Sequence, residues 1–371
     1  MRLLALDRVP EGAVLARDVV GGGRPGAPPL LRAGMRIAPN LAQRAATNGV
    51  GAVWIEDELG AGIEPPEPLA EGVRDHALRA VAQAQDATRR AMATNRSLDA
   101  AVLRELGIAA DAIAQSVADA PWDPSDPAPA DPGRQWHAVR VAALGLAIAA
   151  RHLPTLASPH QRGHADRLGE RLALLGTGLL AHDIGKVALP EALLARTAPA
   201  GPAEERVLER HTIIGEGVMN AAAVPVQIRA AIRAHHEHWD GSGRPDGKAG
   251  AAIHISARIA AVADAYDALI TPRPYRDALA PWAAARAIER AAGSRFDPAV
   301  VEVFSALVMP YPVGHEVVLA NGRHAVVAYV DAEHRLTPLV RARTVGGAVE
   351  EFEAALGGQF AGEPVLAGAG V

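Results

Sequence analysis

The sequence contains no cysteine, which excludes disulfide bonds and metal sites built from thiolates. It also lacks a basic excess, because the formal net charge of its 371 residues is -5 at pH 7. Proteins that bind nucleic acid through broad electrostatic surfaces normally carry such an excess. We therefore expect neither DNA nor RNA as a partner.

Long hydrophobic runs are absent as well. The two most apolar stretches, residues 141–150 and 172–180, fall well short of the roughly 20 residues that a membrane-spanning helix needs. The N-terminal segment is too short, and becomes acidic too soon, for a signal peptide. The sequence thus predicts a cytoplasmic protein without a membrane span.

Lysine is scarce, and its rarity is informative. Of the 37 basic residues only Lys186 and Lys248 are lysine, and the others are arginine. Where arginine is the default cation, a lysine marks a place where a compact ammonium fits and a planar guanidinium does not. Lys186 follows His182-Asp183 closely, which indicates a crowded anionic site.

Composition divides the chain into four segments. Residues 1–66 alternate short apolar runs with Gly and Pro, which indicates a small β-rich region. Residues 69–118 are Ala-rich and predict two helices, interpreted as a connector. Residues 134–310 are dominated by helical periodicity. Residues 311–371 predict a β-hairpin appendix with an Asn-Gly turn, followed by a tail. The predicted fold class is mainly α, a helical bundle with small β regions at both ends.

The helical segment repeatedly offers side chains of the kind that hold divalent cations. His182 and Asp183 end an apolar helix, and further candidates follow on later helices. A carboxylate has two oxygens and can bridge two metals, whereas an imidazole cannot, so Asp183 is the natural shared ligand. Asp264 and Asp267 face one direction of an apolar helix and need a metal or a basic partner. The candidate metal ligands are His182, Asp183, His211, His235, His236 and Asp264.

This ligand set predicts a particular chemistry. Mixed nitrogen and oxygen ligands suit Fe, Mn, Zn, Co or Ni better than Ca. A water held between two such ions becomes a hydroxide near neutral pH, since one metal can already lower its pKa to about 7. Such a hydroxide is a nucleophile suited to a phosphodiester. The sequence therefore indicates a metal-dependent phosphohydrolase.

Three stretches of the sequence resemble the HD-GYP domain, a branch of the HD superfamily of metal-dependent phosphohydrolases. They are His182-Asp183-Ile184-Gly185-Lys186, the run from His235 to Pro245, and Ala263-Asp264-Ala265-Tyr266-Asp267-Ala268-Leu269 with Arg273-Pro274-Tyr275-Arg276. The resemblance covers residues 134–310 and implies an all-helical phosphodiesterase that converts cyclic di-GMP to pGpG or on to GMP. Some members act on other cyclic dinucleotides.

The resemblance also implies roles for individual residues. His137 matches a further histidine ligand, so one metal would take His137, His182, Asp183 and Asp264. The other would take Asp183, His211, His235 and His236. Asp183 and Lys186 would be the catalytic residues, and Lys186 would contact the scissile phosphate. Asp267, Arg273, Arg276 and Arg244 match positions near the substrate. We expect two divalent metal ions, Fe or Mn before others.

Two positions depart from the family pattern. Arg244 stands where the family has the tyrosine that names the motif, which affects substrate handling rather than metal ligands. Gly133 stands where members with three metals carry a glutamate, so the sequence predicts a dinuclear site. In this family that favours pGpG over GMP as the product.

Two other functions stay open at this point. One is a catalytically weak member that binds a cyclic dinucleotide and signals through partner contact, to which Arg244 lends weight. The other is an HD-superfamily hydrolase of nucleotides such as ppGpp or dNTPs, against which the pair His235-His236 argues. The N-terminal region is interpreted as a packing or dimerisation appendage, which leaves a homodimer open.

Overall fold

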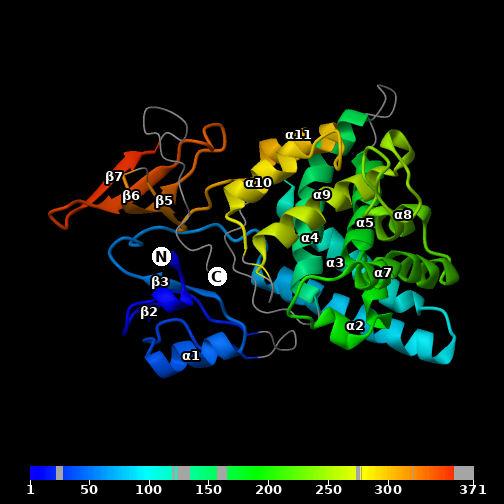
Figure 1. Ribbon diagram of the computed structural model, residues 1–371, viewed down its shortest axis with the longest axis horizontal. Coiled ribbons are helices and arrows are strands. Elements are labelled where there is room, and N and C mark those ends of the chain that lie inside the picture. The colour runs from blue at the N-terminus through cyan, green and yellow to red at the C-terminus, as the bar shows by residue number, and fades with distance from the viewer. Residues whose placement is uncertain are drawn as a thin grey trace.

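The computed structural model describes residues 1–21, 28–118, 122, 134–156, 165–272, 276, 278–319 and 321–354. A helical bundle occupies one side of the molecule, and two small sheets lie together on the other side (Figure 1). The predicted class, mainly α with β regions at both ends, is confirmed. No helix in these ranges is long and apolar enough to cross a bilayer.

The α-helices of the described residues range in length from four to 24 residues. Their bounds are α1 Pro39–Thr47, α2 Glu71–Thr94, α3 Ala100–Val117, α4 Gln135–His152, α5 Ala165–Leu180, α6 Glu191–Leu194, α7 Pro202–Ala221, α8 Val226–Ala234, α9 Ile255–Ile270, α10 Pro281–Arg290 and α11 Pro298–Leu307. A short 3-10 helix, η3 (Ile184–Ala188), follows α5. Local signals explain several starts: Asp99 and Asp297 cap α3 and α11, and Pro298 occupies the first turn of α11.

Helix α4 forms the centre of the bundle because its side chains are small. All its residues from Ala138 to Ala149 are buried except Arg140, and α4 packs against α2, α3, α5, α9 and α11. Where α4 crosses α5, a Cβ on Gly145 would lie 2.6 Å from the Leu179 side chain. Small residues therefore bring α4 close to its neighbours, and with it the candidate ligand His137.

One hydrophobic core runs through most of the helical part. It contains Leu78 from α2 and Leu106 from α3 together with Ile148 from α4 and Phe304 from α11. Helix α2 contacts α3, α4 and η3, and α3 contacts α5. The segment 69–118, expected as a connector, thus packs into the same core as residues 134–310. The four segment boundaries expected from composition stay predictions.

The two β regions are tied to each other. In the N-terminal sheet the strands β1 (Arg2–Ala5), β2 (Val14–Leu15) and β3 (Ala52–Glu56) pair in the order β1-β3-β2. The Leu3 N–H donates to the carbonyl oxygen of Gly314 at 2.9 Å, and Arg8 pairs with Glu316 at 2.7 Å. These contacts join chain segments that are more than 300 residues apart.

The C-terminal region contains the expected hairpin and two further strands. The hairpin itself forms between β4 (Glu316–Val318) and β5 (His324–Tyr329), with the Asn321-Gly322 turn between them. Two further strands, β6 (Leu339–Arg343) and β7 (Val349–Glu353), extend it to a four-stranded antiparallel sheet in sequence order. The expected tail beyond residue 354 lies outside the described residues.

Candidate metal centre

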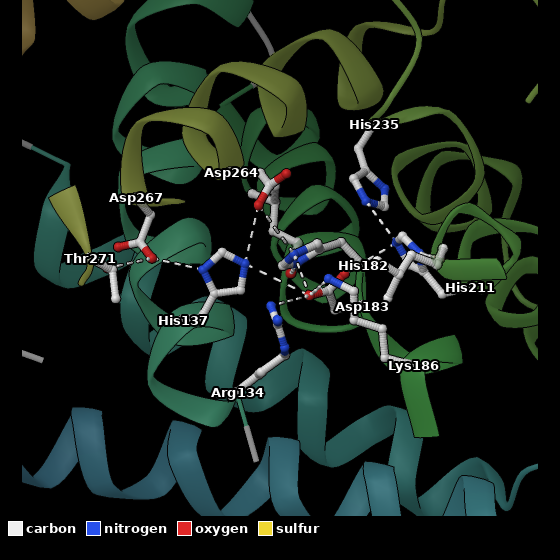
Figure 2. A network of polar contacts seen from close by, with 12 residues as sticks. Arg134, His137, His182, Asp183, Lys186, His211, His235, Asp264, Asp267 and Thr271 are labelled. Atoms are coloured by element: carbon white, nitrogen blue, oxygen red, sulfur yellow. Dashed lines mark hydrogen bonds and ion pairs between the residues drawn. The ribbon is translucent and has the colours of Figure 1, made fainter. Parts of the chain in front are cut away.

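Five elements bring the candidate ligands to one place (Figure 2). His182 and Asp183 lie in the turn that follows α5, directly before η3. The remaining candidates come from the N-terminal part of α4, the middle of α7, the end of α8 and the middle of α9. In that order these residues are His137, His211, the pair His235 and His236, and Asp264.

Glycine allows the turn after α5 to approach α7 closely. A Cβ on Gly185 would lie 2.0 Å from the His211 carbonyl oxygen and 2.6 Å from the Gly215 nitrogen. Both are backbone atoms and cannot rotate away. Gly185 is therefore required for the contact that sets Asp183 and Lys186 against His211.

Backbone carbonyls orient three of the imidazoles. The Nδ1 atoms of His182, His211 and His235 lie 2.7, 2.5 and 2.9 Å from the carbonyl oxygens of Leu179, Leu208 and Ile232. A carbonyl oxygen can only accept, so each Nδ1 carries the proton and each Nε2 presents a lone pair. Metal-binding histidines are held in this way in proteins.

A carboxylate orients the fourth imidazole. His137 Nδ1 donates to Asp267 Oδ2 at 2.7 Å, and Arg140 holds the other oxygen of Asp267 at 2.6 Å. His137 Nε2 then points to Asp264 Oδ1, 3.1 Å away. Asp267 is 3% exposed and lies behind His137. This arrangement is the carboxylate–histidine pair that supports metal ligands.

The inward atoms form three overlapping groups that could each hold a cation. In the first group, donor atoms of His137, His182 and Asp264 lie within 4.8 Å of one another, and in the second those of His211, His235 and His236 do. The third group, His182, Asp183 and His235, shares a residue with each of the other two. Asp183 lies between the first two groups, with Oδ2 at 3.6 Å from His182 Nε2 and Oδ1 at 3.3 Å from His211 Nε2.

The spacing of the second group fits a cation. His211 Nε2 and His235 Nε2 are 3.3 Å apart, and both present lone pairs to each other. Lone pairs at this distance repel unless a cation lies between them. Two nitrogens each about 2.1 Å from one metal, at an angle near 105°, would be separated by about 3.3 Å. The Nε2 of His182 is likewise buried, with no hydrogen-bond partner among the described residues.

The electrostatics of three histidines keep them neutral. Burial lowers the pKa of His182, and it lowers that of His235 well below its usual value. Burial likewise lowers the pKa of His236 to about 4. A neutral imidazole is the form that binds a metal. These three rings are therefore ready to act as ligands at neutral pH.

Neighbouring charged groups shift the pKa values of Asp183, Asp264 and His137. Burial alone would raise the pKa of Asp183, but Lys186 and the nearby histidines hold it well below the usual range. Burial would also raise the pKa of Asp264, but His137 holds it well below its usual value. Burial would lower the pKa of His137, yet Asp264 and Asp267 raise it to about 9. Without a metal, the His137 imidazole in the first group is therefore protonated at neutral pH, and its charge takes the place of a cation.

Two cations approach Asp183 from the side of η3 and the start of α4. Lys186 Nζ lies 2.5 Å from Asp183 Oδ2, and Arg134 Nη1 lies 3.8 Å from the same oxygen. Lys186 had been singled out in the sequence by its rarity, but Arg134 had not. Arg140 and the support of His137 by Asp267 were also missed. Arg140 is three residues from His137 on α4, and Asp267 shares a face of α9 with Asp264, but neither position names its partner.

The residues expected to contact the substrate differ in their exposure and in their partners. Asp267 is turned to His137 and Arg140, so a substrate contact for it stays a prediction. Arg244 is exposed and pairs with Glu209 on α7. Arg276 is exposed and donates to the Ala268 carbonyl. Arg273 and Gly133, the position of the third-metal glutamate, lie outside the described residues.

Part of the helical segment is similar to known proteins. Residues 161–300 match the family model described as HD domain. A cyclic di-GMP phosphodiesterase of Thermotoga maritima is 40% identical over 34% of this chain and 35% of its own length. A cyclic di-GMP phosphodiesterase of Pseudomonas aeruginosa is 36% identical over 55% of this chain and 46% of its own.

A third relative carries a different substrate in its name. The 3'3'-cGAMP-specific phosphodiesterase 2 of Vibrio cholerae is 37% identical over 33% of this chain and 24% of its own length. The chain therefore spans less than half the length of these curated relatives.

Proposed function

We propose that this chain is a metal-dependent phosphodiesterase that hydrolyses a cyclic dinucleotide, because residues 161–300 match the HD domain model and the relatives named above support the resemblance to the HD-GYP domain. We take cyclic di-GMP as the first substrate, with pGpG as the main product. The observation that carries the proposal is the pair of buried donor groups joined by Asp183.

The donor set defines the cofactor that we propose. His137, His182, Asp183 and Asp264 would hold one divalent ion, and Asp183, His211, His235 and His236 a second. The mixture of imidazole and carboxylate suits Fe or Mn before other metals. When bound, such ions lower the pKa of water to about 7 and neutralise the charge of phosphoryl oxygens.

The chain's own residues would supply the rest of the chemistry. Asp183 would contact both cations and keep them together. Lys186, 17% exposed at its side chain, would turn from Asp183 to a phosphate oxygen of the substrate. The guanidinium groups of Arg244, Arg273 and Arg276 would bind guanine edges or the second phosphate. Asp267 would contribute through His137.

A product assay tests the proposal. The full chain is loaded with Mn or Fe and incubated with cyclic di-GMP and, in parallel, with 3'3'-cGAMP, and the products are separated by chromatography. We expect pGpG from cyclic di-GMP and no product from the Asp183→Ala variant. Measurable binding of cyclic di-GMP without any pGpG or GMP would instead support a weak, dinucleotide-binding signalling protein.

A further inference from the structure

Arg134 is held in an unusual backbone conformation beside the metal centre. It directly precedes α4 and has φ 56° and ψ 22°, a left-handed conformation that residues other than glycine rarely adopt. Such conformations persist where the surrounding structure enforces them, and they cluster at functional sites. Its guanidinium points toward Asp183 (Figure 2).

The contact with Asp183 does not explain this placement. Arg134 Nη1 is 3.8 Å from Asp183 Oδ2, beyond hydrogen-bond range, and Lys186 already donates to that oxygen at 2.5 Å. Within the described part of the chain this is the only ion pair of Arg134. Its side chain is 26% exposed, so the guanidinium is still accessible to a ligand.

The charge balance of the centre indicates which ligand. Asp183 and Asp264 carry two negative charges, and Lys186 and Arg134 carry two positive charges. Asp267 is offset by Arg140, 2.6 Å away. Two divalent cations would therefore leave the centre with a large positive excess. Anions from outside the chain must supply the balance, and a phosphodiester is one of them.

We propose that Arg134 binds a non-bridging oxygen of the substrate phosphodiester, and that with Lys186 it forms a two-residue phosphate clamp. This inference rests on the proposed function. A guanidinium offers parallel N–H donors that match the geometry of a phosphate, which an ammonium does not. Arg134 would thus orient the phosphate, while Lys186 would act as a point charge.

Helix α2 holds the residues that follow Arg134. Gln135 Nε2 donates to Gln85 Oε1 at 2.7 Å, and Gln85 is 9% exposed. The guanidinium of Arg74 lies 5.4 Å from the ring centre of Trp136. Both partners belong to α2, so the start of α4 is fixed from outside the catalytic helices. Arg134 is therefore in place before any substrate binds.

The experiment compares Arg134→Gln and Arg134→Lys with wild type and with Arg89→Gln. Arg89 is an exposed arginine of α2 whose partner is Asp86, which makes it a matched control. Four quantities are measured on the metal-loaded full chain: bound metal, melting temperature, KM and kcat for cyclic di-GMP, and the Kd for inorganic phosphate.

We expect Arg134→Gln to keep its metal and its melting temperature. The loss of a hydrogen bond to a charged group should raise KM and the phosphate Kd roughly ten- to hundredfold. Arg134→Lys should lie between Arg134→Gln and wild type, and Arg89→Gln should match wild type.

Three results would overturn the inference. The first is an unchanged KM and phosphate Kd in Arg134→Gln. The second is loss of bound metal from both variants, which would assign Arg134 to the support of Asp183. The third is wild type that binds no phosphate. If wild type binds phosphate but cleaves no cyclic dinucleotide, the proposed function fails alone, and the phosphate Kd still decides the role of Arg134.

Discussion

His137 donates from Nδ1 to Asp267 at 2.7 Å, and its other nitrogen faces Asp264 at 3.1 Å. The two aspartates lie one helical turn apart on α9, yet they contact opposite nitrogens of one ring. Asp264 therefore belongs to the donor group, whereas Asp267 stands behind the ring and fixes its direction. The sequence shows that both carboxylates share a face, but it does not separate these roles.

The first prediction concerns Asp267. Asp267→Asn should lower the affinity for metal by roughly ten- to hundredfold, because partners behind a ligating histidine typically contribute that much. Titration of metal-free protein against a competing chelator measures the effect. Thr271→Val is the control, since Thr271 Oγ1 lies 3.5 Å from the same Asp267 oxygen and adds little. Equal losses in both variants would contradict the role of Asp267.

The second prediction separates Asp183 from Asp264. Asp183 lies between the two donor groups, so Asp183→Ala should abolish binding at both. Asp264 belongs to one group, so Asp264→Ala should leave the histidine group of α7 and α8 able to bind. Elemental analysis of the purified variants gives the metal content. A full metal complement in Asp183→Ala would refute its position as the shared ligand.

The third prediction concerns Gly185. A methyl group there would meet backbone atoms at 2.0 and 2.6 Å, so Gly185→Ala should cost about 1–3 kcal/mol or more of unfolding free energy and distort the site. Gly217 is a matched control, because it lies on α7 and a Cβ added there would have no other atom within 4 Å. Gly217→Ala should stabilise the protein by up to about 1 kcal/mol, since glycine disfavours helix. Urea denaturation measures both, and a stable Gly185→Ala protein would contradict the packing argument.

The fourth prediction is a proton released when metal binds. The pKa of His137 is raised to about 9 without metal, above the usual 6.5, so its proton stabilises the metal-free fold. That contribution is full below pH 6.5 and is lost as the pH rises through about 9. Metal must displace the proton, so the affinity should rise with pH up to about 9. Calorimetry in buffers of different ionisation enthalpy should find close to one proton released from this site at pH 7.

The fifth prediction concerns Arg244, which replaces the motif tyrosine. Arg244 is 58% exposed at its side chain, and its ion pair with Glu209 is worth less than about 1 kcal/mol. Arg244→Ala should therefore leave stability and metal content unchanged while it raises KM. Glu209→Ala, which removes the partner but keeps the guanidinium, is the control. A KM unaffected by Arg244→Ala would remove Arg244 from the substrate site.

Several candidate ligands could be predicted from the sequence because they stand in pairs, whereas His137 was expected only from the resemblance to the HD-GYP domain. His182 with Asp183, and His235 with His236, occupy helix ends, and helix ends can be located from apolar periodicity and proline. The mainly α fold follows from the same periodicity. The position of Arg134 beside Asp183 could not be predicted from the sequence, because no neighbouring residue signals its left-handed backbone conformation.

Contacts distant in sequence account for the rest. Strand β1 is four residues long and pairs with β3 some fifty residues later, so no local pattern reveals it. Strand β7, Val-Glu-Glu-Phe-Glu, is mostly charged and lacks a clear strand signature. The carbonyl anchors of the histidines depend on where each helix turn ends, which sequence locates only to within a few residues.

The shared core of α2, α3 and the bundle has a consequence for cooperativity. Leu78 and Leu106 of the N-terminal helices belong to the same hydrophobic core as Leu146 of α4 and Leu179 of α5. These side chains therefore lose their packing together when the protein unfolds. The N-terminal helices and the catalytic helices should therefore melt as a single unit. A fragment that starts at residue 134 would expose a broad apolar face and aggregate, so we expect the minimal folding unit of the helical part to begin near residue 69.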